Sequence, residues 1–522
     1  MTSATPIADV VVVGAGNAAL CAALAAREQG ADVLVLEKAP EHLRGGNTYF
    51  TGGGFRFPYR GLDDIRALIP EMSDQECAAI DVGAYPQAQF YDDLMRVTEG
   101  LADPEMAQTL VSRAYPTALW MREQGLRWVL LYGRQAYKVG EKLVFWGGLI
   151  TEAIGGGAGL SDALVEMAQK QGIRLQYDAK ATRLHLDDAG RVAGLTVRQG
   201  VPGAEPPSGG GWGTARVPQL EYRFAHLDTG AVVLACGGFE ANPEWRTRYL
   251  GRDWELARVR GTRYNTGDGI RIALEAGAQP FGHWSGCHAV QWDIASPPFG
   301  DRKIGDLFQK HSYPLGLIVN VEGRRFVDEG ADFRNYTYAK YGREVLAQPQ
   351  RVAFQVFDAK VMAMLRDEYR IAAITKATAD TPEALAEALG IDVQGFVETL
   401  AAYNAAVQPG DYNPAVLDGK CTAGITPPKS NWALPLDTPP YTGFAVTCGI
   451  TFTFGGLRID PTTARVLDTE DRPIPGLYAA GELVGGLFYH NYAGGSGLMA
   501  GSVFGRIAGE SAGKQAGAQR TG

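Results

Sequence analysis

The sequence is poor in the features that mark secreted, membrane-spanning and nucleic-acid-binding proteins. Six cysteines are spread over 522 residues and form no CxxC pair, which argues against a disulfide framework and against zinc or iron–sulfur spacing. No apolar run is long enough to span a bilayer, and residues 1–10 lack a signal-peptide pattern. The net charge of −9 argues against a nucleic-acid partner. We therefore expect a cytoplasmic protein with no metal site and no membrane span.

Glycine, by contrast, is in excess. The chain has 67 glycines in 522 residues, about 13% where about 7% is usual. They cluster at residues 45–46, 52–54, 155–157, 485–486 and 494–495. Because glycine has no Cβ, such clusters let a backbone approach a ligand closely. The glycines at 209–211, beside two prolines, are the exception, and we expect a surface loop there.

The first forty residues carry a dinucleotide-binding fingerprint. An apolar strand leads into the sequence GAGNAA at residues 14–19, a helix is predicted to about residue 29, and a second strand ends at Glu37. In this arrangement Gly14 makes the turn, Gly16 admits a pyrophosphate to the helix N-terminus, and Glu37 binds ribose hydroxyls. At this point FAD and a nicotinamide cofactor fit equally well.

The rest of the chain shows two kinds of pattern. Strands that enter glycine turns occur on both sides of an aromatic-rich stretch at about residues 281–440, which indicates a second domain inserted into the first. A chain of 522 residues is also too long for a single core. We expect helices at residues 101–124, 161–171, 382–389, 393–406 and 496–515, and strands at 173–177, 191–197 and 231–234.

Six motifs, in order, resemble the fumarate reductase/succinate dehydrogenase flavoprotein superfamily over nearly the whole chain. They are GAGNAALCAALAAREQGADVLVLEK, GGNTYFTGGG, VVLACGGFEANPEW, NTGDGI, VEGRRFVDEGADFR and GLYAAGELVGGLFYHNYAGGSGL. The resemblance implies an α/β fold, with a Rossmann-like FAD-binding domain at residues 1–282 and 443–522 and an inserted α+β capping domain at residues 283–442. Details at residues 17–19, 334–338 and 489–492 look most like the tricarballylate dehydrogenase branch.

The resemblance also implies FAD and the residues that hold it. In the membrane-bound respiratory members a histidine tethers FAD covalently, and Asn47 stands at about that place, so we expect noncovalent FAD. The implied FAD-binding residues are Gly14, Gly16, Asn17, Ala18, Glu37, Lys38, Gly46, Asn47, Thr48, Gly52, Gly53, Ala235, Gly237, Asp268, Gly481, Glu482, Ser496, Gly497 and Leu498.

At the substrate site the sequence departs from the soluble fumarate reductases. Those enzymes bind a dicarboxylate with two histidines and an arginine, and use another arginine as proton donor. Arg334 matches the proton donor and His288 the histidine of the capping domain, but Phe452 replaces the second histidine and Tyr492 the carboxylate-binding arginine. A tyrosine offers one hydrogen bond instead of an ionic fork. A tyrosine followed by glycines also resembles the 3-ketosteroid dehydrogenases.

Exchange of hydrogen at a CH–CH bond needs hydride transfer at the flavin and proton transfer at the neighbouring carbon. Arg334 can transfer the proton in the reducing direction. For the oxidising direction we also consider tyrosines, and a histidine because its pKa is near neutral. The catalytic candidates are Arg334, Tyr492, His490, His288 and Tyr338, with Tyr336 and Tyr489 as further possibilities.

We therefore expect an FAD-dependent oxidoreductase that acts on a CH–CH bond of a small polycarboxylate, as tricarballylate dehydrogenase does. A ketone-directed dehydrogenase or ene-reductase is the alternative. The electron partner would be external, a quinone or a separate redox protein, because no iron–sulfur spacing is present. Two other classes stay open: a flavoprotein monooxygenase, for which no second NADPH fingerprint is present, and a flavin sensor or electron carrier without a carbon substrate.

Overall fold

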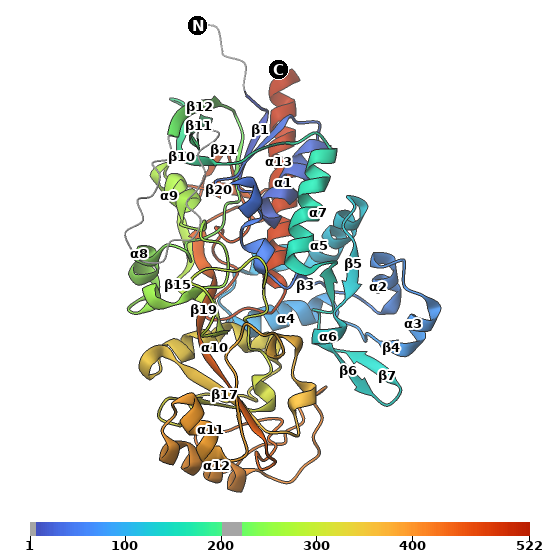
Figure 1. Cartoon of the computed structure of the whole chain (residues 1–522). Helices are drawn as coiled ribbons and strands as arrows, with labels where there is room; N and C mark the ends of the chain where they lie inside the picture. The colour runs from blue at the N-terminus through green and yellow to red at the C-terminus, as the bar shows by residue number, and fades with distance from the viewer. Residues whose placement is uncertain (1–6, 201–221, 522) are drawn as a thin grey trace.

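The computed structural model describes residues 7–200 and 222–521. Figure 1 shows an upper body and a lower body, the lower one formed by the yellow and orange part of the chain. Strands β15 (Pro280–Asp293) and β19 (Tyr441–Leu457) run between them. The surface loop expected at residues 209–211 lies outside the described residues.

The upper body is built on a six-stranded sheet of short, apolar, buried strands. In the order β20-β21-β13-β1-β2-β9 every neighbouring pair is parallel except β20 and β21 at the edge. Continuous apolar runs such as VVVV in β1 are typical of parallel strands covered on both faces. The predicted Rossmann-like α/β fold is confirmed. The strands are β1 (Val10–Val13), β2 (Val33–Leu36), β9 (Arg174–Gln176), β13 (Val232–Leu234), β20 (Arg465–Leu467) and β21 (Pro473–Ala479).

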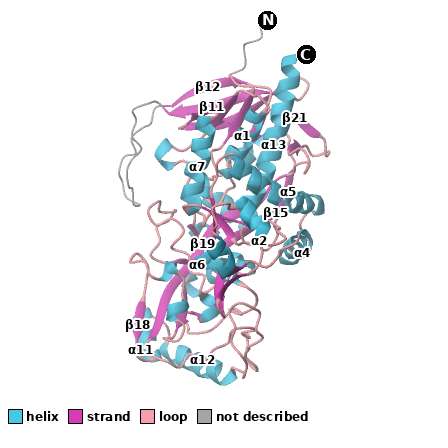
Figure 2. Cartoon of the chain, turned by 90° about the vertical axis from the view of Figure 1, so that its right-hand side faces the viewer, coloured by secondary structure: helices cyan, strands magenta, loops and turns pink. Residues whose placement is uncertain are grey.

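Helices α1 (Asn17–Glu28) and α13 (Ser496–Thr521) pack side by side in this body, as the views of Figures 1 and 2 agree. Helix α1 is rich in alanine, and α13 places glycines against it at every fourth position. A Cβ at Gly505 would lie 2.4 Å from the carbonyl oxygen of Ala18, and one at Gly509 would lie 2.0 Å from that of Ala22. This close approach holds the N-termini of the two helices together at one end of the sheet.

Two of the other helices of the upper body were predicted, at residues 101–124 and 161–171, and both are present with shifted starts, whereas the remaining ones were not predicted. Helix α5 begins later than predicted because the Asp103 side chain accepts hydrogen bonds from the backbone N–H groups of Glu105 and Met106, which fixes the start at Pro104. Helix α7 begins earlier than predicted, within a run of glycines. The helices are α2 (Leu62–Leu68), α3 (Asp74–Ala79), α4 (Gln87–Val97), α5 (Pro104–Glu123), α6 (Tyr132–Gln135), α7 (Gly156–Lys170), α8 (Pro243–Trp245) and α9 (Asp268–Glu275).

Three small sheets complete the upper body. One is an antiparallel meander, and the other two hold the segment between α1 and α7 together. None of the helices in the part of the chain that is described combines the length and apolarity needed to cross a membrane. The strands are β10 (Ala179–Leu186), β11 (Val192–Gly200) and β12 (Tyr222–Asp228) in the meander, and β3 (Gly54–Phe55), β4 (Ile80–Asp81), β5 (Trp128–Leu130), β6 (Ala136–Val139), β7 (Lys142–Phe145) and β8 (Thr151–Ala153) in the others.

The lower body is organised around β19. This long strand pairs with β14, β15, β17 and β18, and β16 pairs with β17. The helices predicted at residues 382–389 and 393–406 are present at those positions. The domain division at 282/283 and 442/443 stays a prediction, and both boundaries fall within β15 and β19. The further elements are β14 (Arg258–Val259), β16 (Leu317–Asn320), β17 (Ala353–Phe357), β18 (Ala377–Ala379), α10 (Tyr338–Leu346), α11 (Pro382–Leu389) and α12 (Val393–Ala406).

Candidate active site

A cavity joins the dinucleotide fingerprint to the predicted substrate residues. The FAD-binding residues expected from the sequence all line it except Gly53 and Ser496. Gly53 packs against the backbone of Gly156, and the Ser496 hydroxyl donates a hydrogen bond to the Ala493 carbonyl. The far end of the same cavity is lined by His288, Arg334, Tyr338 and Tyr492. Segments far apart in the sequence thus share one space.

The dinucleotide end has the geometry that the fingerprint predicts. Gly14 has φ +108°, and a Cβ there would lie 2.4 Å from the Ala235 carbonyl oxygen. Gly16 precedes α1 and has no side chain to cap it. The Asn17 N–H donates to Thr48 Oγ1, and the N–H groups that follow it in the first turn are able to bind an anion. The buried Glu37 carboxylate accepts from the backbone N–H groups of Ala15 (3.0 Å) and Ala39 (2.7 Å). Burial raises the pKa of Glu37, and these two hydrogen bonds oppose the rise.

Lys38 and Asp268 form an ion pair beside Glu37. Lys38 Nζ lies 2.6 Å from Asp268 Oδ2, and Lys180 Nζ lies 2.6 Å from Asp268 Oδ1. Burial favours the neutral acid, but the two lysines outweigh it and lower the pKa of Asp268 to about 2. The cluster carries one net positive charge and lines the cavity.

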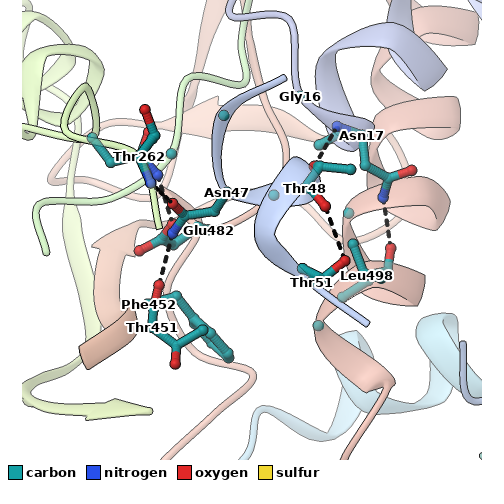
Figure 3. Close-up of a pocket in the computed structure, with 18 of the residues that line it drawn as sticks. Gly16, Asn17, Asn47, Thr48, Thr51, Thr262, Thr451, Phe452, Glu482 and Leu498 are labelled. Atoms are coloured by element: carbon teal, nitrogen blue, oxygen red, sulfur yellow. Dashed lines mark hydrogen bonds between the residues drawn. The ribbon is translucent and has the colours of Figure 1, made fainter. Parts of the chain in front are cut away.

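Two asparagines fix the backbone around the middle of the cavity (Figure 3). The Asn17 backbone N–H donates to Thr48 Oγ1 (2.9 Å), and its side-chain Nδ2 donates to the Leu498 carbonyl (2.8 Å). Asn47 Nδ2 donates to the Thr451 carbonyl (2.7 Å), and Asn47 Oδ1 accepts from the Thr262 N–H (2.9 Å). Loops from three regions of the chain are therefore locked together before any ligand binds.

A pair of carboxyl groups lies next to Asn47. Glu240 is fully buried, accepts from Asn47 Nδ2 (2.7 Å) and lies next to Glu482, while its Oε2 has no partner among the described residues. Glu482 accepts from the N–H of Thr453 (2.8 Å), and no lysine or arginine of residues 7–200 and 222–521 pairs with either acid. Burial and then the neighbouring Glu482 carboxylate raise the pKa of Glu240 well above its ordinary value. Burial also raises the pKa of Glu482, so the site favours the protonated form of both carboxyl groups.

These features fit FAD. The N-terminus of α1 lines the cavity and suits a pyrophosphate, Glu37 lines it at the end of β2, where the fingerprint predicts ribose hydroxyls, and glycines 14 and 16 place no side chain there. Asn47 is fixed by three hydrogen bonds. Within the described residues, no group of three or more His, Cys, Asp or Glu side chains is arranged to hold a metal ion.

Arg334 is the charged side chain at the substrate end that has no carboxylate partner among the described residues. It lies in the short turn Arg334–Tyr336 that precedes α10, and its Nη1 lies 3.3 Å from His311 Nδ1. Its buried Nε has no hydrogen-bond partner, and no carboxylate of the described chain pairs with it. Burial and then the nearby Arg366 lower the pKa of Arg334 to about 10. A guanidinium with a free donor and no counter-ion is suited to a carboxylate or to proton transfer.

His311 is the neighbour of Arg334 that sequence reasoning missed. It is buried, lines the cavity, and its Nε2 has no partner among the described residues. Burial and then Arg334 lower the pKa of His311 well below its ordinary value, so it is neutral at pH 7. Its sequence context, FQKHSYP, offers no spacing that would have identified it.

A cluster of aromatic rings adjoins Arg334 and His311, with the Tyr338 ring centroid 5.5 Å from Arg334 Cζ and 4.8 Å from the His311 ring. The Tyr338 and Tyr492 hydroxyls hydrogen-bond each other, and the His288 ring lies against both tyrosines with centroid distances of 5.0 and 4.8 Å. Phe452 packs edge-on against Tyr492 at 5.2 Å. Burial and then Arg260 lower the pKa of His288 well below its ordinary value, and neither of its ring nitrogens has a partner within the described residues. His288 is thus a neutral ring in an apolar wall.

Two further arginines line this end and were also missed. Arg260 Nη2 lies 2.6 Å from Asp306 Oδ1, and Arg134 Nη1 lies 3.4 Å from Asp306 Oδ2. Both come from segments outside the six motifs, which is why the resemblance did not indicate them. Three arginines and one aspartate give this end of the cavity a positive charge.

His490 and Tyr489 do not reach the cavity. His490 has φ +57°, its backbone N–H donates to His283 Nδ1 (3.0 Å), and the two histidine rings lie 4.6 Å apart. Tyr489 stacks on His283 with ring centroids at 5.6 Å. Tyr336 also points elsewhere, because its hydroxyl donates to Asp93 Oδ2 (2.7 Å). The structure therefore brings Arg334, Tyr338, His288 and Tyr492 together and leaves these three outside.

Comparison with known proteins agrees with this architecture. The family described as FAD binding domain matches residues 9–498. Fumarate reductase (cytochrome) from Shewanella frigidimarina is 30% identical over 506 residues, which cover 95% of this chain and 75% of that protein. The 3-oxosteroid 1-dehydrogenase of Mycobacterium tuberculosis is 26% identical over 567 residues, covering 94% and 95%. The structure of the open conformation of a flavocytochrome c3 fumarate reductase matches with a TM-score of 0.69 and 26% identity, over 98% of this chain and 78% of that one.

The chain belongs to the FAD-binding family that contains the fumarate reductases, and it is an FAD-dependent dehydrogenase or reductase of CH–CH bonds.

Proposed function

We propose that the enzyme adds or removes hydrogen across a carbon–carbon bond next to a carboxylate of a small organic acid. The observation that carries this proposal is Arg334, a guanidinium with a buried, unpartnered Nε and no carboxylate partner in the described chain. Burying such a charge without a counter-ion is costly. A substrate carboxylate would supply the missing charge.

FAD, when bound, would take or give the hydride. Arg334 would donate or receive the proton at the neighbouring carbon, and its pKa, lowered to about 10, makes that exchange easier than for an ordinary arginine. His311 would orient Arg334 through its Nδ1. The aromatic wall of His288, Phe452 and Tyr492 would exclude water from the reacting carbons.

Polycarboxylates resembling tricarballylate rank first as substrates. The three arginines at this end of the cavity exceed its one aspartate by two positive charges, and the branch motifs point the same way. A ketone is the second candidate because the hydrogen-bonded hydroxyls of Tyr338 and Tyr492 could polarise a carbonyl oxygen. The electron partner would be a quinone or a separate redox protein, and FAD would be held without a covalent bond.

An anaerobic screen tests the proposal. The flavin absorbance of purified, oxidised enzyme would be followed with saturated polycarboxylates, ketosteroids and cyclic ketones, and that of reduced enzyme with the unsaturated counterparts. Bleaching by a polycarboxylate supports the first candidate, and bleaching only by a ketone supports the second. Rapid reduction by NADPH with no response to any carbon substrate would favour a monooxygenase or carrier instead. Yellow colour that stays in the pellet after acid precipitation would show that FAD is covalently bound.

A further inference from the structure

Gln135 is a buried amide that the proposed mechanism leaves unexplained. It is the last residue of α6, a single turn between β5 and β6, and its backbone N–H donates to the Leu131 carbonyl (2.9 Å). The residue is 0% exposed, yet neither Oε1 nor Nε2 has a hydrogen-bond partner among the described residues. It lines the same cavity as Arg334.

The surroundings place Gln135 at the substrate end. Leu131 and Leu149 line the cavity with it, and a Cβ at Gly495 would lie 2.4 Å from Leu149 Cδ1. Gly495 belongs to the glycine loop that follows Tyr492. The preceding residue in sequence, Arg134, contacts Asp306, the partner of Arg260. The amide therefore shares this end with the three arginines and the aromatic wall.

An amide buried in this way is costly to the free protein. Each polar group that loses water without gaining a partner destabilises the folded state, and buried polar groups in proteins are nearly always paired. Apolar neighbours such as Leu131 and Leu149 offer no partner. The same local structure would accept a methionine or leucine at this position, so the amide is explained best by a ligand.

The chemistry of the amide indicates which ligand group it binds. The Nε2 group donates and Oε1 accepts. A carboxylate only accepts, so it would leave Oε1 unpaired and facing a negative charge. A hydroxyl or a carboxamide both donates and accepts, and would satisfy both ends of the amide.

We infer that Gln135 is a specificity-determining residue, whose amide binds a neutral hydroxyl or carboxamide group on the substrate whose carboxylate Arg334 holds. This inference rests on the proposed function for the carboxylate. The substrate would then be a carboxylic acid, which can carry further carboxylates near the other arginines, with a neutral hydrogen-bonding substituent instead of a carboxylate at the position that faces Gln135.

The first experiment does not depend on the substrate. Melting temperatures of FAD-loaded Gln135→Met and of a matched control, Gln355→Met, would be measured without substrate. Gln355 is also fully buried, but its Nε2 donates to Gln291 Oε1 (2.6 Å) and to the Lys310 carbonyl (2.8 Å). We expect Gln135→Met to melt at or above the wild-type temperature and Gln355→Met to melt below it. Equal losses would overturn the inference, because Gln135 would then be paired within the free protein.

The second experiment measures binding with three probes of similar size. Fumarate, its monoamide fumaramate, and crotonate share one carboxylate and differ at the other end in a carboxylate, a carboxamide and a methyl group. Their dissociation constants would be read from the absorbance change of the oxidised flavin. We expect the wild type to prefer fumaramate over crotonate by about 10-fold and Gln135→Met to lose that preference.

Other outcomes separate the two proposals. An unchanged fumaramate-to-crotonate ratio in Gln135→Met would overturn the inference about Gln135 while leaving the proposed function intact. If no probe perturbs the wild-type spectrum, the proposed carboxylate site fails, and Gln135 is judged by the melting temperatures alone. A weaker affinity of Gln135→Met for FAD itself would assign the amide to the cofactor and overturn the inference.

Discussion

At the dinucleotide end of the cavity Glu37 and Asp268 have hydrogen-bond or ion-pair partners, whereas at the substrate end several buried polar side chains have no partner among the described residues. Glu37 accepts two backbone hydrogen bonds and Asp268 binds two lysines. At the other end Arg334 Nε, His311 Nε2 and both polar atoms of Gln135 are unpaired. The first region is therefore organised before FAD binds. In the second region the unpaired polar groups lower the folding stability of the free protein, and this loss is recovered when a substrate binds and forms hydrogen bonds with them.

The largest effect should come from removing the guanidinium at the substrate end. Arg334→Ala should lower kcat by about 10²–10⁴-fold, the usual contribution of a proton-transfer group, while FAD stays bound. Arg334→Lys keeps a charge but not the planar fork, and should recover only part of the rate. Steady-state kinetics and the flavin spectrum measure both quantities.

Arg324→Ala is the matched control for that variant. Arg324 lies in the same segment, but it forms an exposed ion pair with Glu398 and does not line the cavity. It should leave kcat unchanged, since exposed pairs contribute little. Near-normal turnover by Arg334→Ala would show that another group transfers the proton.

The pH profile sharpens the same comparison. Arg334 is protonated below its pKa of about 10 and loses its proton above it. Turnover in the direction that needs a proton donor should therefore fall as pH rises through about 10. His288 and His311 are already neutral because burial depresses their pKa values, so neither should produce a step between pH 6 and 8. Such a step, persisting in Arg334→Lys, would indicate a histidine in the chemistry.

At the dinucleotide end, a change should affect cofactor affinity and leave the chemistry alone. Glu37→Arg removes the acceptor of the Ala15 and Ala39 N–H groups and adds a cation where a ribose is expected. Because a hydrogen bond to a charged group contributes about 1.5–3 kcal/mol, FAD affinity should fall by about 10- to 150-fold. Flavin fluorescence titration of the apoprotein measures it. Glu37→Gln, which keeps one acceptor, should lose less, and equal affinities for both variants and the wild type would contradict the assignment of Glu37.

The same contrast explains which residues the sequence could reveal. The fingerprint at residues 14–19 and Glu37 belong to one short strand–helix–strand unit. Local secondary structure is therefore enough to predict where these residues lie relative to one another. Arg334 and Tyr492 could be identified because they lie in two of the six motifs, which occur here in the same order as in the flavoprotein superfamily. His311, Arg134 and Arg260 depend on the approach of segments up to about two hundred residues apart, which periodicity and spacing do not encode. His490 was considered because a histidine is suited to acid–base chemistry near neutral pH, but its left-handed backbone directs it to His283 instead.

The smallest effect should come from the tyrosine pair. Tyr492→Phe removes one hydroxyl and leaves that of Tyr338 unpaired in an apolar wall, so kcat/KM should fall by about 1–2 kcal/mol, or roughly 5- to 30-fold. Tyr338→Phe should have a similar effect, and the double variant should cost less than the sum, because both single changes break the same hydrogen bond. Tyr403→Phe, a buried tyrosine that donates to the Leu434 carbonyl (3.0 Å) away from the cavity, is the control. It should lower the melting temperature without changing kcat/KM.

If the true substrate is a ketone, Tyr492→Phe should approach the loss seen for Arg334→Ala, because the hydroxyl would then act on the carbonyl oxygen where charge develops. Additive losses in the double variant would show that the two hydroxyls act on the substrate separately.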